Sequence, residues 1–99
     1  MTTTQQQQLL ELSPAEFAAQ VNSPNTVVFD VREQAEYARE HVAGAQNIPL
    51  SRLTVDTVPQ TTKKVILYCQ SGNRSRRAAK LFFAAAITKW PILTADLRP

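Results

Sequence analysis

Residues 65–75 constrain the fold of this chain more than any other stretch. They read Val-Ile-Leu-Tyr-Cys-Gln-Ser-Gly-Asn-Arg-Ser and pass from an apolar, β-favouring run into a polar segment that contains a glycine. We predict a strand over residues 65–68, a short loop that begins at Cys69, and a helix over residues 75–86 whose first residue is the N-cap. Gly72 gives the loop backbone conformations that other residues rarely adopt. This order places the single cysteine of the chain at the carboxyl end of a strand.

Strand-like and helix-like segments alternate along the rest of the chain. Residues 12–17, Leu-Ser-Pro-Ala-Glu-Phe, combine a serine N-cap, a proline at the first helical position and a glutamate three residues after the cap. The other predicted elements, in chain order, are a strand at 9–12, a helix ending near 21, a strand at 26–31, a charged helix at 33–40, a brief strand at 45–48, a short helix or turn within 50–62, and a last strand around 90–93. Because Pro91 cannot donate a ladder hydrogen bond, we expect that last strand at a sheet edge or a bulge. The order predicts an α/β domain with a mainly parallel, five-stranded sheet flanked by helices.

The length of the chain, 99 residues, suits one domain with one core. Residues 1–8 are polar and repetitive, so we expect a disordered tail there and a folded domain over residues 9–99. The longest apolar run, residues 81–87, is far shorter than the roughly 18 residues of a membrane span. The first residues lack the basic and apolar regions of a signal peptide. We therefore expect a cytoplasmic protein without a membrane segment.

The charge pattern points to a small anionic partner. The formal net charge is +3, and much of the excess lies in one short segment, at Arg74, Arg76, Arg77 and Lys80. No aromatic residues are interleaved with these cations, so nucleic acid is not an expected partner. His41 is the only histidine, and no Cys/His cluster has the spacing of a zinc site. We expect neither a metal nor a cofactor.

The loop has the composition of a site for a reactive thiolate. A helix N-terminus and a nearby arginine both stabilise a thiolate, and the loop offers both. Successive backbone N–H groups can form an anion-binding concavity, to which serine hydroxyls and Arg74 add further donors. We interpret Cys69 as the catalytic nucleophile, although a lone cysteine can also be a small buried hydrophobe. The candidate substrate-binding residues are Gln70, Ser71, Gly72, Asn73, Arg74 and Ser75.

The loop fits a C-x-x-G-x-R pattern from Cys69 to Arg74 and resembles the active-site loop of rhodanese-like sulfurtransferases. A second stretch has the order and spacing of the segment that precedes this loop in the family. It comprises Asp30-Val-Arg32, Glu36-Tyr37, His41-Val42, Gly44-Ala45 and Asn47-Ile48-Pro49. The helix signature at residues 12–17 is similar as well. The resemblance covers residues 9–86 and implies a rhodanese-like fold.

The resemblance implies a thiosulfate sulfurtransferase-type reaction. Cys69 would attack the outer sulfur of thiosulfate or a related sulfane donor, release sulfite and become a persulfide. Cyanide, a thiol or an acceptor protein would then take the sulfur, in ping-pong kinetics. The loop amides and Arg74 would bind the sulfonate end of the donor. For Asp30, Arg32 and His41 we favour structural roles, because polar groups of this kind are commonly structural partners.

Three other functions remain open. Some dual-specificity phosphatases share the rhodanese fold, but their loops resemble C-x5-R, whereas Cys69 to Arg74 is C-x4-R and Ser75 stands at the longer position. The loop length therefore favours a sulfurtransferase over a phosphatase. The chain could also be a persulfide relay for a protein partner, or a catalytically silent binding module. Silent members typically lack the loop cysteine that this chain retains.

The C-terminal segment departs from the family pattern. Members usually have a glycine after the loop helix, then a strand, a Gly-Gly turn and a final helix with an aromatic residue. Here residues 84–87 contain no glycine, Ala95-Asp96 stands where Gly-Gly would, and the sequence stops at Pro99. We expect the final helix to be missing or truncated, with less cover over one side of the sheet.

Overall fold

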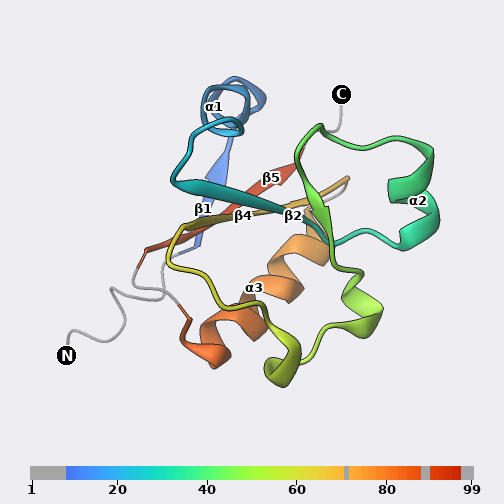
Figure 1. Cartoon of the computed structure of the whole chain (residues 1–99), viewed down its shortest axis with the longest axis vertical. Helices are drawn as coiled ribbons and strands as arrows, with labels where there is room; N and C mark the ends of the chain where they lie inside the picture. The colour runs from blue at the N-terminus through green and yellow to red at the C-terminus, as the bar shows by residue number, and fades with distance from the viewer. Residues whose placement is uncertain (1–8, 71, 88–89, 97–99) are drawn as a thin grey trace.

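A computed structural model describes residues 9–70, 72–87 and 90–96. It contains a five-stranded sheet in the order β1-β5-β4-β2-β3, and every pair of neighbouring strands is parallel (Figure 1). The strands are β1 (Leu9–Leu12), β2 (Thr26–Asp30), β3 (Gln46–Asn47), β4 (Lys64–Cys69) and β5 (Ile92–Asp96). The predicted α/β fold with five mainly parallel strands is confirmed, and the sheet is parallel throughout.

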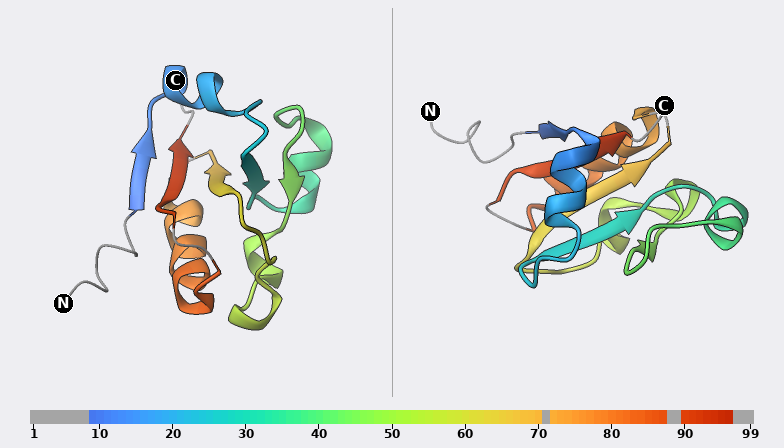
Figure 2. Two further views of the ribbon diagram at one scale, coloured as in Figure 1. Left: turned by 60° about the vertical axis from the view of Figure 1, so that its left-hand side comes forward. Right: turned by 90° about the horizontal axis from the view of Figure 1, so that it is seen from above.

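Helices cover both faces of this sheet (Figure 2). In the described ranges the helices are α1 (Pro14–Gln20), α2 (Gln34–Arg39) and α3 (Asn73–Ala85). The 3₁₀ turns η2 (Leu50–Arg52) and η3 (Val55–Thr57) lie in the weakly patterned stretch. One buried cluster joins α3 and residues next to the 3₁₀ turns to the sheet, and a second joins α1 and α2 to the opposite face. In the described part of the chain, no helix is long and apolar enough to cross a membrane.

The start of α1 follows directly from the sequence. The Ser13 hydroxyl accepts a hydrogen bond from the Glu16 backbone N–H at 3.1 Å, and the Glu16 carboxylate accepts one from the Ser13 N–H at 2.8 Å. Pro14 occupies the first turn, where no donor is required. Phe17 is the buried residue of the helix, and its ring stacks on Tyr68 of β4 with centroids 6.1 Å apart. The predicted capping box is confirmed.

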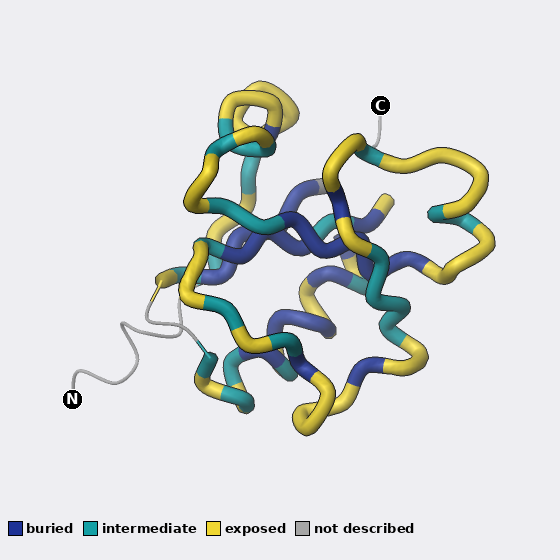
Figure 3. Tube along the Cα trace, in the orientation of Figure 1, coloured by how far each residue is buried: buried dark blue, intermediate teal, exposed yellow. Residues whose placement is uncertain are grey.

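β4 is the central strand and is buried on both faces, as the dark blue trace in Figure 3 shows. Because side chains alternate along a strand, Val65, Leu67 and Cys69 join the cluster on the α3 side. Ile66 and Tyr68 join the cluster on the side of α1 and α2. The alternation therefore directs the Cys69 side chain toward α3.

Two predicted boundaries were wrong. The helix after the loop begins at Asn73 and its N-cap is Gly72, so Ser75 lies in the first turn instead of capping it. A left-handed Gly72, with φ of 84°, turns the chain early enough for the N-cap to lie three residues sooner than predicted.

The last strand was also misplaced. β5 lies inside the sheet, between β1 and β4, and not at an edge or a bulge. Pro91 directly precedes the first strand residue, Ile92, so its missing N–H is not needed by the ladder. Among the described strands, the edges of the sheet are β1, which pairs with β5, and β3, which pairs with β2. Within the described residues no helix follows β5, and the predicted tail at residues 1–8 lies outside them.

Candidate functional site

Cys69 is the last residue of β4, and its side chain is fully buried. Its Sγ accepts hydrogen bonds from two backbone N–H groups, that of Gly72 at 2.9 Å and that of Ser75 at 3.3 Å. The thiol also lies 3.5 Å from the Ser75 hydroxyl oxygen, to which it can donate. Two amides that converge on one sulfur favour an anionic sulfur at this point.

The first turn of α3 is fixed around this sulfur by a small set of local contacts. The fully buried Ser75 hydroxyl donates to the Gly72 carbonyl at 3.0 Å, and the Arg76 N–H donates to the same carbonyl at 3.2 Å. Gly72, with its positive φ, turns its own N–H toward the sulfur. The positive end of a 13-residue helix therefore lies at Cys69.

Arg74 lies in the first turn of α3, and its side chain is held by a residue of α2. Its guanidinium forms two hydrogen bonds with the Glu36 carboxylate of α2, at 2.6 and 3.1 Å. This contact is the largest cause that lowers the pKa of Glu36 to about 2, with the Glu33 backbone N–H next, and it also raises the pKa of Arg74. Glu36 is thus part of the site. From the sequence alone, Glu36 was identified only as part of the upstream segment that resembles the family.

The other predicted loop residues differ in exposure. Gln70 and Asn73 are exposed, while Gly72 and Ser75 are buried beside the sulfur. Ser71 lies outside the described residues. Of the cations further along α3, Arg77 and Lys80 are exposed, and Arg76 pairs with Glu11 of β1. The structure therefore brings only part of the basic cluster to the loop.

Asp30, the last residue of β2, and Arg32 form a buried ion pair. The Arg32 Nε and Nη2 atoms donate to the Asp30 carboxylate at 2.8 to 3.1 Å, and Nη2 also donates to the Glu40 carbonyl at 2.7 Å. The hydrogen bonds that Arg32 donates to Asp30 are the main cause that raises the pKa of Arg32. The Asn47 side-chain amide donates to the carbonyls of both residues, at 2.9 and 3.0 Å. These contacts are those of a structural pair that holds the ends of β2 and α2.

His41 likewise makes structural contacts. Its Nδ1 lies 2.8 Å from the Tyr37 carbonyl, and its ring stacks on the Tyr37 ring with centroids 3.8 Å apart. The Tyr37 hydroxyl donates to the Ala45 carbonyl at 2.6 Å. The stacked rings of Tyr37 and His41 therefore link the end of α2 to the segment before β3.

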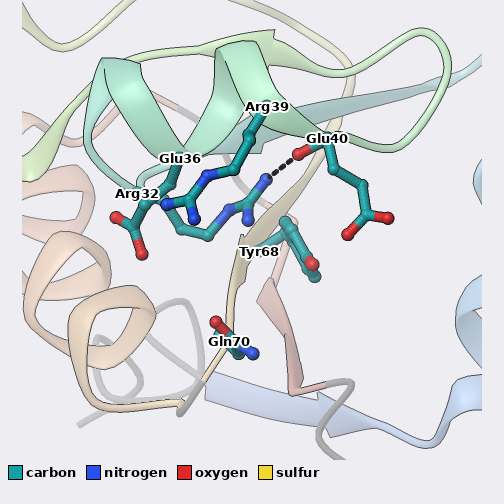
Figure 4. Close-up of a pocket in the computed structure, with 6 residues that line it drawn as sticks. All are labelled: Arg32, Glu36, Arg39, Glu40, Tyr68 and Gln70. Atoms are coloured by element: carbon teal, nitrogen blue, oxygen red, sulfur yellow. Dashed lines mark hydrogen bonds between the residues drawn. The ribbon is translucent and has the colours of Figure 1, made fainter.

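A polar pocket of about 240 Å³ adjoins the loop between α2 and the end of β4 (Figure 4). It is lined by Arg32, Glu36, Arg39, Glu40, Tyr68 and Gln70. Gln70 directly follows Cys69, and Glu36 contributes to the pocket wall while it binds Arg74. The Arg32 guanidinium lies over the Tyr68 ring, 5.2 Å from its centroid. Among the described residues, no group of three or more His, Cys, Asp or Glu side chains could hold a metal ion.

Comparison with known proteins finds one family. The family model described as "Rhodanese-like domain" matches residues 13–95. The protein YqhL of Bacillus subtilis, itself uncharacterized, is 42% identical over 77 residues, which cover 77% of this chain and 60% of that protein. A thiosulfate:glutathione sulfurtransferase of Saccharomyces cerevisiae is 31% identical over 74 residues, covering 61% of this chain and 53% of the yeast protein.

A solved structure gives the same answer for the fold. A rhodanese-related protein from Thermoplasma volcanium superposes with a TM-score of 0.67 at 25% identity, covering 88% of this chain and 84% of that one. The chain spans about half the length of the curated relatives it matches, from 35% to 60%.

Proposed function

Because this chain belongs to the rhodanese-like family, we propose that it moves a sulfane sulfur from thiosulfate or a related persulfide donor to a thiophilic acceptor, through a persulfide on Cys69. The observation that carries the proposal is the pair of backbone N–H groups, from Gly72 and Ser75, that point at Sγ. Sulfurtransferase relatives support the same class of reaction.

In the first half-reaction the Cys69 thiolate attacks the outer sulfur of thiosulfate. A new S–S bond forms, the S–S bond of thiosulfate breaks, and sulfite leaves with the bonding electron pair. The attacking sulfur starts, and the persulfide ends, as an anion at the N-terminus of α3. Fixed donors that need no reorganisation favour both anions.

The loop supplies groups for the anionic end of the donor. Arg74 has five N–H donors, and Glu36 uses two of them, so further donors are available for a sulfonate. Exposed Gln70 and Asn73, together with Ser71, complete the proposed binding set for the sulfonate. The Ser75 hydroxyl is fully buried and donates its proton to the Gly72 carbonyl, so Ser75 contributes through its backbone N–H. The backbone donors of Gly72 and Ser75 are assigned to the sulfur itself.

Mass spectrometry of the intact protein after thiosulfate treatment tests this proposal. We expect the mass to rise by one sulfur atom, and the added sulfur to be absent from Cys69→Ser. Cyanide should then remove the sulfur from the loaded protein as thiocyanate. The proposal is wrong if neither thiosulfate nor polysulfide loads the parent protein.

Two further readouts separate the alternatives. Efficient hydrolysis of p-nitrophenyl phosphate without thiocyanate formation would identify a phosphatase instead. A loaded protein that keeps its sulfur with every small acceptor, and releases it only to a protein, would be a relay.

A further inference from the structure

The pocket beside the loop contains two unpaired opposite charges. Four charged residues line it, and two of them are neutralised: Arg32 by Asp30, and Glu36 by Arg74. Arg39 and Glu40 are exposed, and within the described residues neither side chain forms an ion pair. In Figure 4 the two side chains extend to different sides of the pocket, the Arg39 guanidinium toward Glu36 and the Glu40 carboxylate away from it. The pocket therefore offers one cation and one anion at separate points.

Such an arrangement matches a zwitterion. A guanidinium binds a carboxylate through a pair of parallel hydrogen bonds, and a carboxylate accepts from an ammonium group. The exposed Gln70 side-chain amide and the half-buried Tyr68 phenol add neutral polar groups to the same walls. The volume of about 240 Å³ suits a small molecule and is too small for a folded partner.

We propose that this pocket binds the amino-acid head group of a small thiol, with Arg39 at the carboxylate and Glu40 at the ammonium, and that this thiol accepts the sulfur. The inference rests on the proposed function and names its acceptor class. Gln70 connects the two sites, because it lines the pocket and its Cα is one peptide unit, about 3.8 Å, from that of Cys69.

The second half-reaction then balances without an external oxidant or reductant. The acceptor thiolate attacks the outer sulfur of the Cys69 persulfide, and a new S–S bond forms on the acceptor. The S–S bond to Cys69 breaks, and its electron pair leaves on Sγ as a thiolate. That thiolate returns to the N–H groups of Gly72 and Ser75.

Four thiols of similar size allow the contribution of each charge to be measured separately. Cysteine carries both, 3-mercaptopropionate only the carboxylate, cysteamine only the ammonium, and 2-mercaptoethanol neither. In single-turnover discharge of the loaded protein, we expect Arg39→Gln to raise the half-saturating concentration of cysteine and 3-mercaptopropionate by about tenfold, the size of one lost charge-assisted hydrogen bond. Glu40→Gln should raise the half-saturating concentration of cysteine and cysteamine by about the same factor. Neither variant should change discharge to 2-mercaptoethanol.

Matched variants control for net charge. Arg52→Gln and Asp56→Asn remove one exposed charge each at positions that do not line the pocket, and they should leave all four thiols unchanged. The inference is overturned if Arg39→Gln affects all four thiols equally, affects none of them, or has the same effect as Arg52→Gln.

A binding measurement keeps this test independent of sulfur chemistry. Unreactive S-methylcysteine is titrated into the Cys69→Ser protein and followed by amide chemical shifts. We expect the amide signals of Arg39, Glu40 and Gln70 to shift as S-methylcysteine is added. In the Arg39→Gln background, the concentration that gives half of the full shift should rise about tenfold. If the protein never loads with sulfur but this binding is present, the proposed function fails and the pocket assignment stands. If loading succeeds and no binding occurs, only the pocket assignment fails.

Discussion

Arg74 in the first turn of α3 and Glu36 of α2 form a two-point ion pair, with Nη1 2.6 Å from Oε1 and Nη2 3.1 Å from Oε2. The two residues are 38 positions apart in the sequence, so the pair joins the start of α3 to a distant helix. Both side chains are 27% exposed, and pairs of this kind contribute at most about 1 kcal/mol to stability. The main effect of the pair is structural, because it fixes Arg74 and one wall of the pocket relative to each other.

The ion pair makes the effect of Glu36→Gln on stability depend on pH. The pKa of Glu36 is lowered from 4.5 to about 2, so its stabilising contribution is present above about pH 4.5 and is lost as the pH falls through 2. We expect Glu36→Gln to lower the melting temperature at pH 7, and this difference to shrink between pH 4.5 and 2. Thermal unfolding by circular dichroism measures it. Glu11→Gln, which removes a carboxylate from another arginine pair, should give a smaller difference at pH 7. A difference for Glu36→Gln that grows on acidification would contradict the assignment.

Gly72 and Gly44 offer a matched pair of substitutions. Both have left-handed backbones, with φ of 84° and 87°. A left-handed alanine is strained by roughly 1–2 kcal/mol, so each Gly→Ala variant should lose about 1 kcal/mol of unfolding free energy after the gain from a less flexible unfolded chain. Urea denaturation measures this loss.

Of these two variants, only Gly72→Ala should affect sulfur loading, because the Gly72 N–H donates to Sγ and Gly44 lies elsewhere. We expect thiosulfate loading of Gly72→Ala to slow by about tenfold, the size of one weakened hydrogen bond to an anionic sulfur. Gly44→Ala, whose added methyl group meets no atom within 4 Å, should load at the parental rate. Equal loading rates in the two variants would remove the Gly72 amide from the mechanism.

Ala86 ends α3 in a left-handed conformation, with φ of 53° and ψ of 43°. Glycine is the usual residue at such a position, and the sequence lacks one there. We expect Ala86→Gly to raise the free energy of unfolding by about 0.5–1 kcal/mol, since relief of strain exceeds the added entropy of the unfolded chain. Ala84→Gly, inside the helix on an exposed position, should lower it by about 1 kcal/mol. Urea denaturation of both variants checks the opposite signs.

Asp30→Asn tests the structural assignment of the buried ion pair. Asp30 is fully buried and Arg32 is 7% exposed, so loss of the carboxylate charge leaves a guanidinium without its counter-ion. We expect a loss of about 3 kcal/mol in unfolding free energy, as for other broken buried pairs. The exposed control Asp56→Asn should change it by less than about 0.5 kcal/mol. A variant of Asp30 that keeps its stability but fails to load sulfur would instead assign this residue to the chemistry.

Local patterns in the sequence predicted most of the fold. The capping box of Ser13 and Glu16 and the strand predicted at residues 65–68 depend on short-range physics, and the structure confirms both, with β4 one residue longer at each end. The start of α3 was misread because Gly72 and Ser75 are both good capping residues, and only the left-handed backbone of Gly72 decides between them. The position of β5 was predicted wrongly because a proline removes a ladder hydrogen bond only when it lies inside a strand. Pro91 lies one residue before the first residue of β5.

Long-range contacts at the site could not be predicted in this way. The Arg74–Glu36 pair and the charges of Arg39 and Glu40 at one pocket depend on how α2 packs beside the loop. Spacing along the chain does not specify such a contact. The catalytic role of Cys69 and the substrate-binding roles of residues 70–75 stay predictions, which the loading experiments address.

The place of β5 between β1 and β4 determines when the sheet can close during synthesis. Among the described strands, β1 comes first in the chain and β5 last, and within them β1 hydrogen-bonds only to β5. A segment of 79 residues separates the two strands. While the ribosome makes the intervening segment, β2, β3 and β4 can pair, but one side of β4 and all of β1 lack partners. Such non-local pairing slows folding and leaves strand edges open to other chains. The nascent protein is therefore most prone to aggregate just before Ile92–Asp96 emerges.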